Sequence, residues 1–353
     1  MRCFALAEEL RQRGGSICFI CRDSPGDFSS YLNQQGFKVH RLPALRKADA
    51  STGDPETREL SDADAIEVEA VLTTESALGA IDWLVVDHYG LDTGWQKRVR
   101  GQTKAVLVID DNADKGGYQA DVIVNPNVHA DSLEYVAPSN IRLLMGPRYA
   151  LLRAEFRGQP LQRRARRVPR IFVCIGAADL FGVTVQVIKT LEQLSAGFSA
   201  TVVVGANTEG KFEIRERAAV TGDRIRVVED PSSMADLMDE CDLAICTPST
   251  TLLECRARGL DCIVVKTANN QARVFSWVHD VSLQAMADQP IPPAWNPKSE
   301  VSRALSTLPH PVSEVASQAV QVDGEGARRI ADVLYSVVEA STGLRTGADT
   351  CAS

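Results

Sequence analysis

The strongest chemical signal in the sequence is VVDHYGLD, residues 85–92. Asp87, His88 and Tyr89 follow a run of apolar residues, and Gly90 ends that run. In an open α/β sheet, ligands bind beyond the carboxyl ends of the strands, so these side chains would face a ligand. Histidine transfers protons near neutral pH, and a neighbouring carboxylate could orient it or hold a substrate hydroxyl. The pattern fits equally well a turn capped by Asp87 and a structural His88.

A second strand end carries adjacent carboxylates in VIDDNADKGGYQADVIVNPN, residues 108–127. Paired carboxylates such as Asp110 and Asp111 can bind a divalent cation. Neighbouring side chains on a strand point to opposite faces. We therefore expect these two residues to form turns and hydrogen bonds rather than a metal site.

A third strand end, FVCIGAADLFGVT, is a small-residue turn that contains Gly176, Ala177 and Asp179. The backbone at such a turn can approach a ligand closely and offer N–H groups to a phosphate. Taken alone the signal is weak, because most turns of this kind bind nothing. The sequence contains no phosphate-binding loop of the G-x-x-x-x-G-K-[ST] type.

The stretch CTPSTTLLECRARGL, residues 246–260, predicts a helix that is capped by Ser249. Thr250 and Thr251 begin this helix, and its free N–H groups and dipole favour an anion. Glu254 follows one turn later, where it could accept hydrogen bonds from ribose hydroxyls. Ordinary helix capping is the alternative interpretation. The next strand end offers three amide side chains, Asn269, Asn270 and Gln271.

These residues depend on an alternation of strands and helices that runs through the chain twice. In the first half, strands are predicted at 16–22, 38–42, 83–88, 105–110, 121–125 and 141–145, and helices at 1–13 and 65–79. In the second half, strands are predicted at 171–175, 201–204, 225–228, 243–246 and 262–266, and helices at 183–194, 232–239, 250–258, 272–285 and 324–338. The continuously apolar run Trp83–Val86 is typical of a parallel strand covered on both faces. The pattern predicts two Rossmann-like α/β domains with a ligand cleft between them.

We place the domain boundary at the arginine-rich segment 157–170. It has no interleaved aromatic residues, so a linker is favoured over a nucleic-acid patch. The N-terminal domain then covers residues 1–156, the C-terminal domain 171–340 and a disordered tail 341–353. Residues 47–64 are expected to form a surface loop and residues 290–297 an extended segment.

Composition narrows the class of protein. The 353 residues, 44% hydrophobic and 24% charged, suit two globular domains. A net charge of −8 argues against a nucleic-acid partner. No apolar run is long enough to span a membrane, and Glu8 and Glu9 interrupt any signal-peptide pattern, which indicates a cytoplasmic protein. Of nine cysteines, Cys18 and Cys21 would point to opposite faces of a strand, so buried reduced thiols are favoured over a metal site.

Taken in order, these stretches resemble one family, the UDP-sugar hydrolases of pseudaminic acid biosynthesis, which act on UDP-2,4-diacetamido-2,4,6-trideoxy-β-L-altropyranose. The resemblance covers roughly residues 1 to 340. It rests on MRCFALAEELRQRG, ICFICRD, VVDHYGLD, VIDDNADKGGYQADVIVNPN, GPRYALLRAEF, IGAAD, STTLLECRARGL, NNQ and VDGEGARRI. The resemblance implies a two-domain GT-B fold, a monomer without a cofactor, and a product used in flagellin glycosylation.

The chemistry that the resemblance implies is hydrolysis of a UDP-sugar. Water attacks the anomeric carbon, the C–O bond breaks and UDP leaves. The C-terminal domain would bind UDP and the N-terminal domain the sugar, without a metal. The implied nucleotide-binding residues are Gly176, Ser249, Thr250, Thr251, Glu254, Asn270 and Gln271, and the implied catalytic residues are Asp87, His88 and Tyr89.

The sequence also departs from the family pattern. The family has a first strand that ends in a G-x-G-H loop with the proposed catalytic base, whereas the match here starts at Met1-Arg2-Cys3. We therefore expect the first strand of the N-terminal domain to be missing and the start to be truncated. Ala177 replaces a family glycine, and Pro248 replaces a small residue. Two alternatives stay open: an impaired nucleotide-sugar-binding remnant that uses His88, and a GT-B glycosyltransferase.

Overall fold

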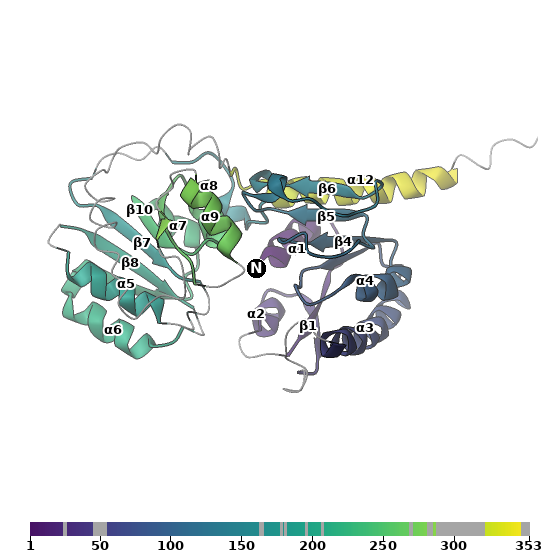
Figure 1. Ribbon diagram of the computed structural model, residues 1–353, viewed down its shortest axis with the longest axis horizontal. Coiled ribbons are helices and arrows are strands. Elements are labelled where there is room, and N and C mark those ends of the chain that lie inside the picture. Colours follow the sequence, from purple (N-terminus) through teal and green to yellow (C-terminus); the bar gives the residue numbers. More distant parts are fainter. Residues whose placement is uncertain are drawn as a thin grey trace, which may run out of the picture. The chain divides into compact units, whose positions relative to one another are not determined.

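A computed structural model shows two compact units, each built from parallel β-strands and helices (Figure 1). Unit 1 comprises residues 1–151 together with the chain from Gly326 onward, and unit 2 comprises residues 152–325. The structure describes residues 1–23, 27–44, 55–161, 166–176, 179, 182–194, 197–205, 208–267, 271–280, 285–286 and 322–346.

The described residues of unit 1 form six strands, all paired in parallel, in two sheets. The strands are β1 (Cys18–Arg22), β2 (Lys38–Leu42), β3 (Trp83–Val86), β4 (Ala105–Ile109), β5 (Val122–Asn125) and β6 (Arg142–Met145). The helices are α1 (Arg2–Gln12), α2 (Ser29–Gln34), α3 (Pro55–Ser76), α4 (Thr93–Val99) and α12 (Gly326–Thr346). One sheet is β1-β2, and the other has the order β3-β4-β5-β6.

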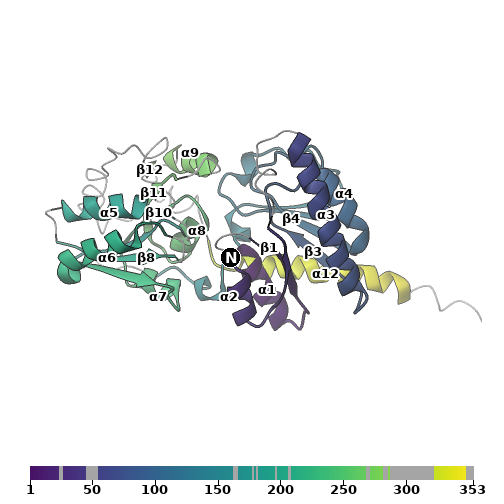
Figure 2. The same ribbon diagram turned by 90° about the horizontal axis from the view of Figure 1, so that it is seen from below.

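The same helices cover both sheets of unit 1, although β1 and β3 belong to different sheets (Figure 2). On one face, Phe4 of α1 packs in the apolar cluster of β1-β2, whereas Leu6 packs in the cluster of β4, β5 and β6. On the other face, a single cluster joins α3 to Ile20 of β1 and Val86 of β3. Within the described residues, β1 and β3 each keep one unpaired edge. Accordingly β3 is mostly half-buried, whereas its neighbour β4 is buried throughout.

Unit 2 contains one parallel sheet with the order β12-β11-β10-β7-β8-β9. Its strands are β7 (Arg170–Cys174), β8 (Ser199–Val204), β9 (Ile225–Glu229), β10 (Leu243–Cys246), β11 (Asp261–Val265) and β12 (Ala285–Met286). Its helices are α5 (Val183–Glu192), α6 (Lys211–Val220), α7 (Met234–Asp239), α8 (Thr250–Ala257) and α9 (Ala272–Asp280). An apolar cluster joins one face of this sheet to α5 and α6. Short 3₁₀ turns in the two units are Arg100–Gln102, Ala130–Ser132, Pro147–Tyr149, Ala154–Phe156 and Gly222–Arg224.

The predicted α/β architecture and the predicted strands are confirmed, with small shifts at the strand ends. The expected surface loop at 47–64 is wrong in part, because α3 begins at Pro55, and proline is tolerated in a first helical turn. The expected disordered tail is also wrong in part, because α12 extends to Thr346. Helices α2, α4 and α6 are additional to the predicted ones. The segment expected to be extended, 290–297, lies outside the described residues.

The C-terminal helix α12 packs within unit 1, although the sequence analysis assigned residues 171–340 to the C-terminal domain. Its buried residues Ile330 and Leu334 share an apolar cluster with Leu6 of α1 and Leu107 of β4. The Trp83 indole Nε1 donates to the carbonyl oxygen of Leu334 at 3.1 Å. A last helix of either domain has the same amphipathic pattern, so only packing decides where it belongs.

Gly326, the second glycine of the motif VDGEGARRI, is the first residue of α12, and its position requires a glycine. A Cβ atom at Gly326 would collide with the backbone of Ala150 and Tyr149. We predict that Gly326→Ala lowers the free energy of unfolding by at least about 2 kcal/mol, because the colliding atoms are backbone and cannot rotate away. Urea unfolding measures the change. Gly101→Ala, whose Cβ would meet open space, is the control, and equal midpoints for the two variants would contradict this account.

Candidate functional site

A charged network lies at the carboxyl ends of β3, β4 and β5 in unit 1. Arg2 Nη2 and Nε donate to the two carboxylate oxygens of Asp87 at 2.6 and 3.1 Å. Arg2 Nη1 donates to both oxygens of Asp111 at 2.9 and 2.8 Å. Tyr89 Oη and Asn127 Nδ2 also donate to Asp111, each at 2.6 Å. One guanidinium therefore holds two carboxylates beside a phenol and an amide.

The surroundings of Arg2 and Tyr89 fix the protonation states of these two side chains. Burial lowers the pKa of Arg2, but Asp87 and Asp111 outweigh burial and raise it, so the guanidinium stays charged. Burial and the negative Asp111 raise the pKa of Tyr89 to about 12, so its phenol keeps its proton at neutral pH. Two carboxylates and one guanidinium leave one net negative charge. Such a group suits a polyhydroxylated ligand, because carboxylates accept hydrogen bonds from hydroxyls.

His88 lies next to this network in sequence but is exposed. Its Nδ1 accepts a hydrogen bond from the Gly90 N–H at 3.0 Å, which places the ring proton of a neutral His88 on Nε2. Asp87 is bound by Arg2, and no hydrogen bond joins Asp87 to His88 in the described part of the chain. The carboxylate next to His88 therefore positions Arg2 and not the imidazole.

Asp110 and Asp111 diverge, as the sequence predicted for adjacent strand-end residues. Asp110 is buried, and its carboxylate accepts hydrogen bonds from the Asn112 N–H at 2.9 Å and from the Tyr118 hydroxyl. Asp111 instead faces Arg2. The expected turn-forming and hydrogen-bonding roles are confirmed.

In unit 2, the turn between β10 and α8 forms the predicted helix cap. Ser249 Oγ accepts a hydrogen bond from the Thr251 N–H at 3.3 Å and shares another with Thr247 Oγ1 at 2.9 Å. Ser249 and Thr250 are half-buried, whereas Thr251 is buried. The start of α8 thus presents two hydroxyl-bearing residues and a positive helix end, a combination that favours an anion.

Glu254 lies in α8, one turn after this cap, and is buried. Burial raises the pKa of Glu254 to about 7, although Arg153, whose Nη2 lies 3.9 Å from Glu254 Oε1, opposes the shift. Arg153 Nη2 also forms an ion pair with Glu155 Oε1 at 2.6 Å, and this second partner weakens the effect of Arg153 on Glu254. Near neutral pH both protonation states of Glu254 are populated, so it can accept or donate a hydrogen bond to a ligand hydroxyl.

The remaining predicted residues of unit 2 have different surroundings. Gly176 has φ +97°, and a Cβ there would meet open space, so the backbone at this turn is approachable. Asp179 is buried and accepts hydrogen bonds from the N–H groups of Val183 and Thr184 at 2.9 and 2.6 Å, so the protein's own carboxylate occupies the start of α5. Gln271 Oε1 accepts from the Thr267 N–H at 2.7 Å. Asn269 and Asn270 lie outside the described residues.

Sequence reasoning missed two arginines and one asparagine of these networks. Arg2 was assigned only to a helix, and its partners Asp87 and Asp111 lie 85 and 109 residues away. Arg153 lies in the stretch GPRYALLRAEF, but its link to Glu254 depends on the fold and could not be predicted from that stretch. Asn127 lies two residues beyond Asn125, the last residue of β5, so the same strand-end argument used for Asp87 would have found it.

The chain has a GT-B-type fold of two Rossmann-like units, which it shares with glycosyltransferases of known structure. MurG of Acinetobacter baumannii superposes with a TM-score of 0.61 at 15% identity, over 95% of both chains. UGT89C1 of Arabidopsis thaliana, solved with UDP-L-rhamnose, gives 0.61 at 12% identity over 94% of this chain and 95% of that one. No protein-family model matches the chain.

Sequence relatives are distant. The spore coat polysaccharide biosynthesis protein SpsG of Bacillus subtilis is 22% identical over 342 residues, which cover 95% of this chain and 92% of SpsG. The UDP-2,4-diacetamido-2,4,6-trideoxy-beta-L-altropyranose hydrolase of Campylobacter jejuni is 23% identical over 55% of this chain and 70% of its own length. The Methanocaldococcus jannaschii protein MJ1062 is 25% identical over 193 residues. The matched residues cover 52% of this chain and only 40% of the length of MJ1062.

These relatives connect the chain to enzymes that process nucleotide sugars. Among the described residues, no helix has the length and apolarity required to cross a bilayer.

The raised pKa of Glu254 has a measurable effect on stability. A folded-state pKa of about 7, above the ordinary 4.5, stabilises the fold below pH 4.5 and loses that contribution as the pH rises through 7. We predict that Glu254→Gln stabilises unit 2 by on the order of 3 kcal/mol at about pH 8 and by little at about pH 4.

Urea unfolding at the two pH values tests this prediction. Glu216→Gln, at an exposed position of α6, is the control and should leave stability nearly unchanged at both pH values. If Glu254→Gln gave no gain in stability at the higher pH, the ionised Glu254 carboxylate would not destabilise the fold, and the raised pKa would be contradicted.

Proposed function

We propose that this chain binds a UDP-sugar and hydrolyses its anomeric C–O bond, releasing UDP and a free 2,4-diacetamido-2,4,6-trideoxyhexose for pseudaminic acid synthesis. The observation that carries the proposal is the start of α8, where the Ser249 cap, Thr250 and buried Glu254 follow one another on a GT-B-type unit. The hydrolase name of the Campylobacter relative supports the choice of reaction.

The start of α8 suits a departing diphosphate. Breaking the C–O bond leaves negative charge on the UDP oxygen, and the N–H groups of a helix start stabilise such charge. The hydroxyls of Ser249 and Thr250 would donate further hydrogen bonds to phosphate oxygens. Glu254, with both protonation states accessible near neutral pH, would bind a ribose hydroxyl.

The charged network of unit 1 is the proposed sugar-side site. Asp87 and Asp111 would accept hydrogen bonds from sugar hydroxyl or N-acetyl N–H groups, and Tyr89 would donate one. Arg2 holds both carboxylates in place through its hydrogen bonds. His88, which is exposed, is the candidate proton carrier for the attacking water.

Glycosyl transfer is the second candidate function. It is favoured by the glycosyltransferases that share the fold and by the polysaccharide-biosynthesis name of SpsG, the relative that covers nearly the whole chain. The two reactions break the same bond and differ only in the acceptor, which is water in one and an alcohol in the other.

Nucleotide binding tests the role of the α8 cap. We predict that Ser249→Ala weakens UDP binding about tenfold, measured by calorimetry, because a phosphate partner and the helix cap are lost together. Ser233→Ala is the matched control: Ser233 caps α7 in the same unit and accepts from the Asp236 N–H, so it should cost similar stability without affecting UDP. Equal losses of affinity in both variants would overturn the placement of UDP.

Product analysis separates the two reactions. We expect the purified chain to release UDP and free sugar from the UDP-linked diacetamido sugar in water alone. UDP release that depends on an added acceptor alcohol would establish the glycosyltransferase instead. Absence of turnover with intact UDP binding would identify a nucleotide-sugar-binding remnant.

We also propose that unit 1 accommodates one more parallel strand between β1 and β3. The two strands lie under the same helices on both faces, yet each keeps an unpaired edge among the described residues. Unpaired edges leave backbone N–H and C=O groups without partners. The carboxyl end of such a strand would lie beside Asp87, because parallel strands end at one side of a sheet. It could therefore add a catalytic group to the sugar-side site.

An extended chain tests this proposal. If in-frame codons upstream of Met1 encode a strand, we predict that including it raises the Tm and speeds UDP release by roughly 10²–10⁴-fold, the usual contribution of a positioned general base. The chain starting at Met1 is the control. A stop codon directly upstream, or equal Tm values for both chains, would contradict the proposed strand.

A further inference from the structure

Two groups of metal-ligating side chains converge in the described parts of the two units. In unit 2 they are Cys246, Cys255 and Cys262, and in unit 1 they are Cys18, His40 and Glu75. In each group, one ligand atom per residue lies within 4.8 Å of the others. Neither group belongs to the sites described above, so each could bind something that the proposed function does not require.

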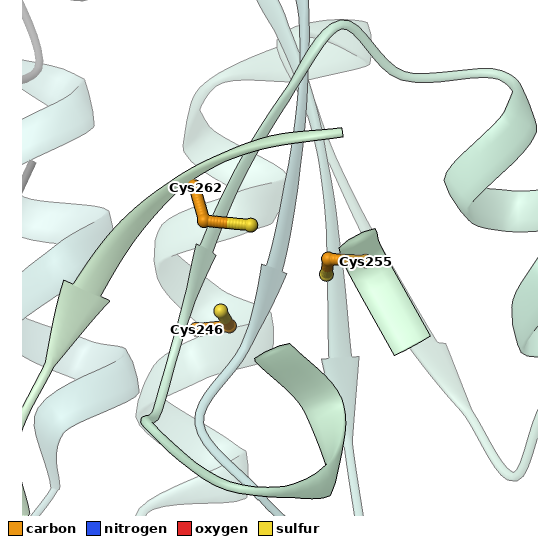
Figure 3. Close-up of side chains that lie close together, drawn as sticks. All are labelled: Cys246, Cys255 and Cys262. Atoms are coloured by element: carbon orange, nitrogen blue, oxygen red, sulfur yellow. The ribbon is translucent and has the colours of Figure 1, made fainter. Parts of the chain in front are cut away.

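The thiol group of unit 2 is better explained as core packing. Figure 3 shows the sulfur atoms of Cys246, Cys255 and Cys262 directed toward one another from β10, α8 and β11. All three residues are buried, and burial raises the pKa of the Cys255 thiol. A divalent ion bound by three thiolates would leave one net negative charge in this core, which is costly. Buried reduced cysteines pack as small apolar residues.

The group in unit 1 has a different setting. Cys18 lies on β1, His40 on β2 and Glu75 in the last turn of α3. Cys18 and Ile20 point to one face of the sheet, and His40 pairs with Ile20 in register, so both ligand side chains face α3. All three residues are only half-buried, so water and ions can reach them.

The present contacts already bring two ligand atoms together. His40 Nε2 and Glu75 Oε1 are 2.9 Å apart, and Lys38 Nζ lies 2.6 Å from the same oxygen. Lys38 is half-exposed and can swing away from Glu75, which leaves the carboxylate available.

We propose that Cys18, His40 and Glu75 bind a zinc ion. Sulfur, imidazole nitrogen and carboxylate oxygen are the ligand types that Zn²⁺ prefers, and such ligand atoms stand about 3.3–3.6 Å apart around a tetrahedral ion. The observed separations are within reach of that geometry after small side-chain movements. The half-buried position leaves the fourth ligand to water.

The charges balance on binding. The Cys18 thiol releases its proton to solvent, His40 binds through Nε2 with its ring proton on Nδ1, and Glu75 binds as the carboxylate. A thiolate, a neutral imidazole and a carboxylate then neutralise the two positive charges of Zn²⁺. This neutrality distinguishes the group from the three thiols of unit 2. A bound ion would tie the end of α3 to the β1-β2 sheet.

Lys38 gives the proposal a distinctive consequence. Its ammonium competes with a metal ion for Glu75 Oε1 and repels the ion. Lys38→Met should therefore raise zinc affinity about two- to fivefold, in line with the loss of one exposed ion pair. If the ion pair only held the fold together, removing Lys38 would lower stability and leave metal binding unchanged.

Titration of the full chain with Co²⁺ and then Zn²⁺ tests the site. We expect one equivalent to bind, with a thiolate-to-cobalt charge-transfer band that Zn²⁺ displaces. Cys18→Ser and His40→Gln should weaken binding more than about tenfold. Cys246→Ser should not, and it serves as the matched thiol control. Loss of binding in Cys246→Ser alone, or no binding by the unaltered chain, would overturn the proposal. UDP binding is measured separately, so failure here leaves the proposed function untouched.

Discussion

Parallel β-strands must be covered by helices on both faces, and this requirement organises both units. In unit 2 it is met by one sheet of six strands, in which β10 is buried along its whole length. In unit 1 the helices α1 and α3 each cover two separate sheets. Side-chain packing under these helices, and not backbone pairing between β1 and β3, therefore joins the two sheets of unit 1.

Strands that are buried along their length, such as β4 and β10, carry only apolar side chains, so the charged groups near them gather beyond the strand ends. Unit 1 stabilises Asp87 and Asp111 by placing Arg2 between them. Unit 2 buries Glu254, whose nearest cation among the described residues is Arg153, with Nη2 3.9 Å from Glu254 Oε1. Burial therefore raises the pKa of Glu254 to about 7. The first arrangement favours the fold, whereas the second costs stability at neutral pH. Such a cost is typical of a residue retained for binding.

Local patterns predicted the strands and the α8 cap because each is decided within a few residues. The apolar run Trp83–Val86 and the serine at position 249 are examples. Contacts between distant residues could not be predicted in this way. Arg2 meets Asp111 across 109 residues, and its helix alone gives no hint of that partner. Cys18 likewise gave no sign of Glu75, because α3 approaches β1 only in the folded unit.

The place of α12 bears on the order in which the protein folds during synthesis. The core of unit 1 includes Ile330 and Leu334, which leave the ribosome after all of unit 2. Unit 2 is continuous in sequence and can complete its sheet earlier. The domain that is made first is thus finished last. Until α12 arrives, the apolar face around Leu6 and Leu107 is uncovered, and the nascent chain has to be kept from aggregating during that interval.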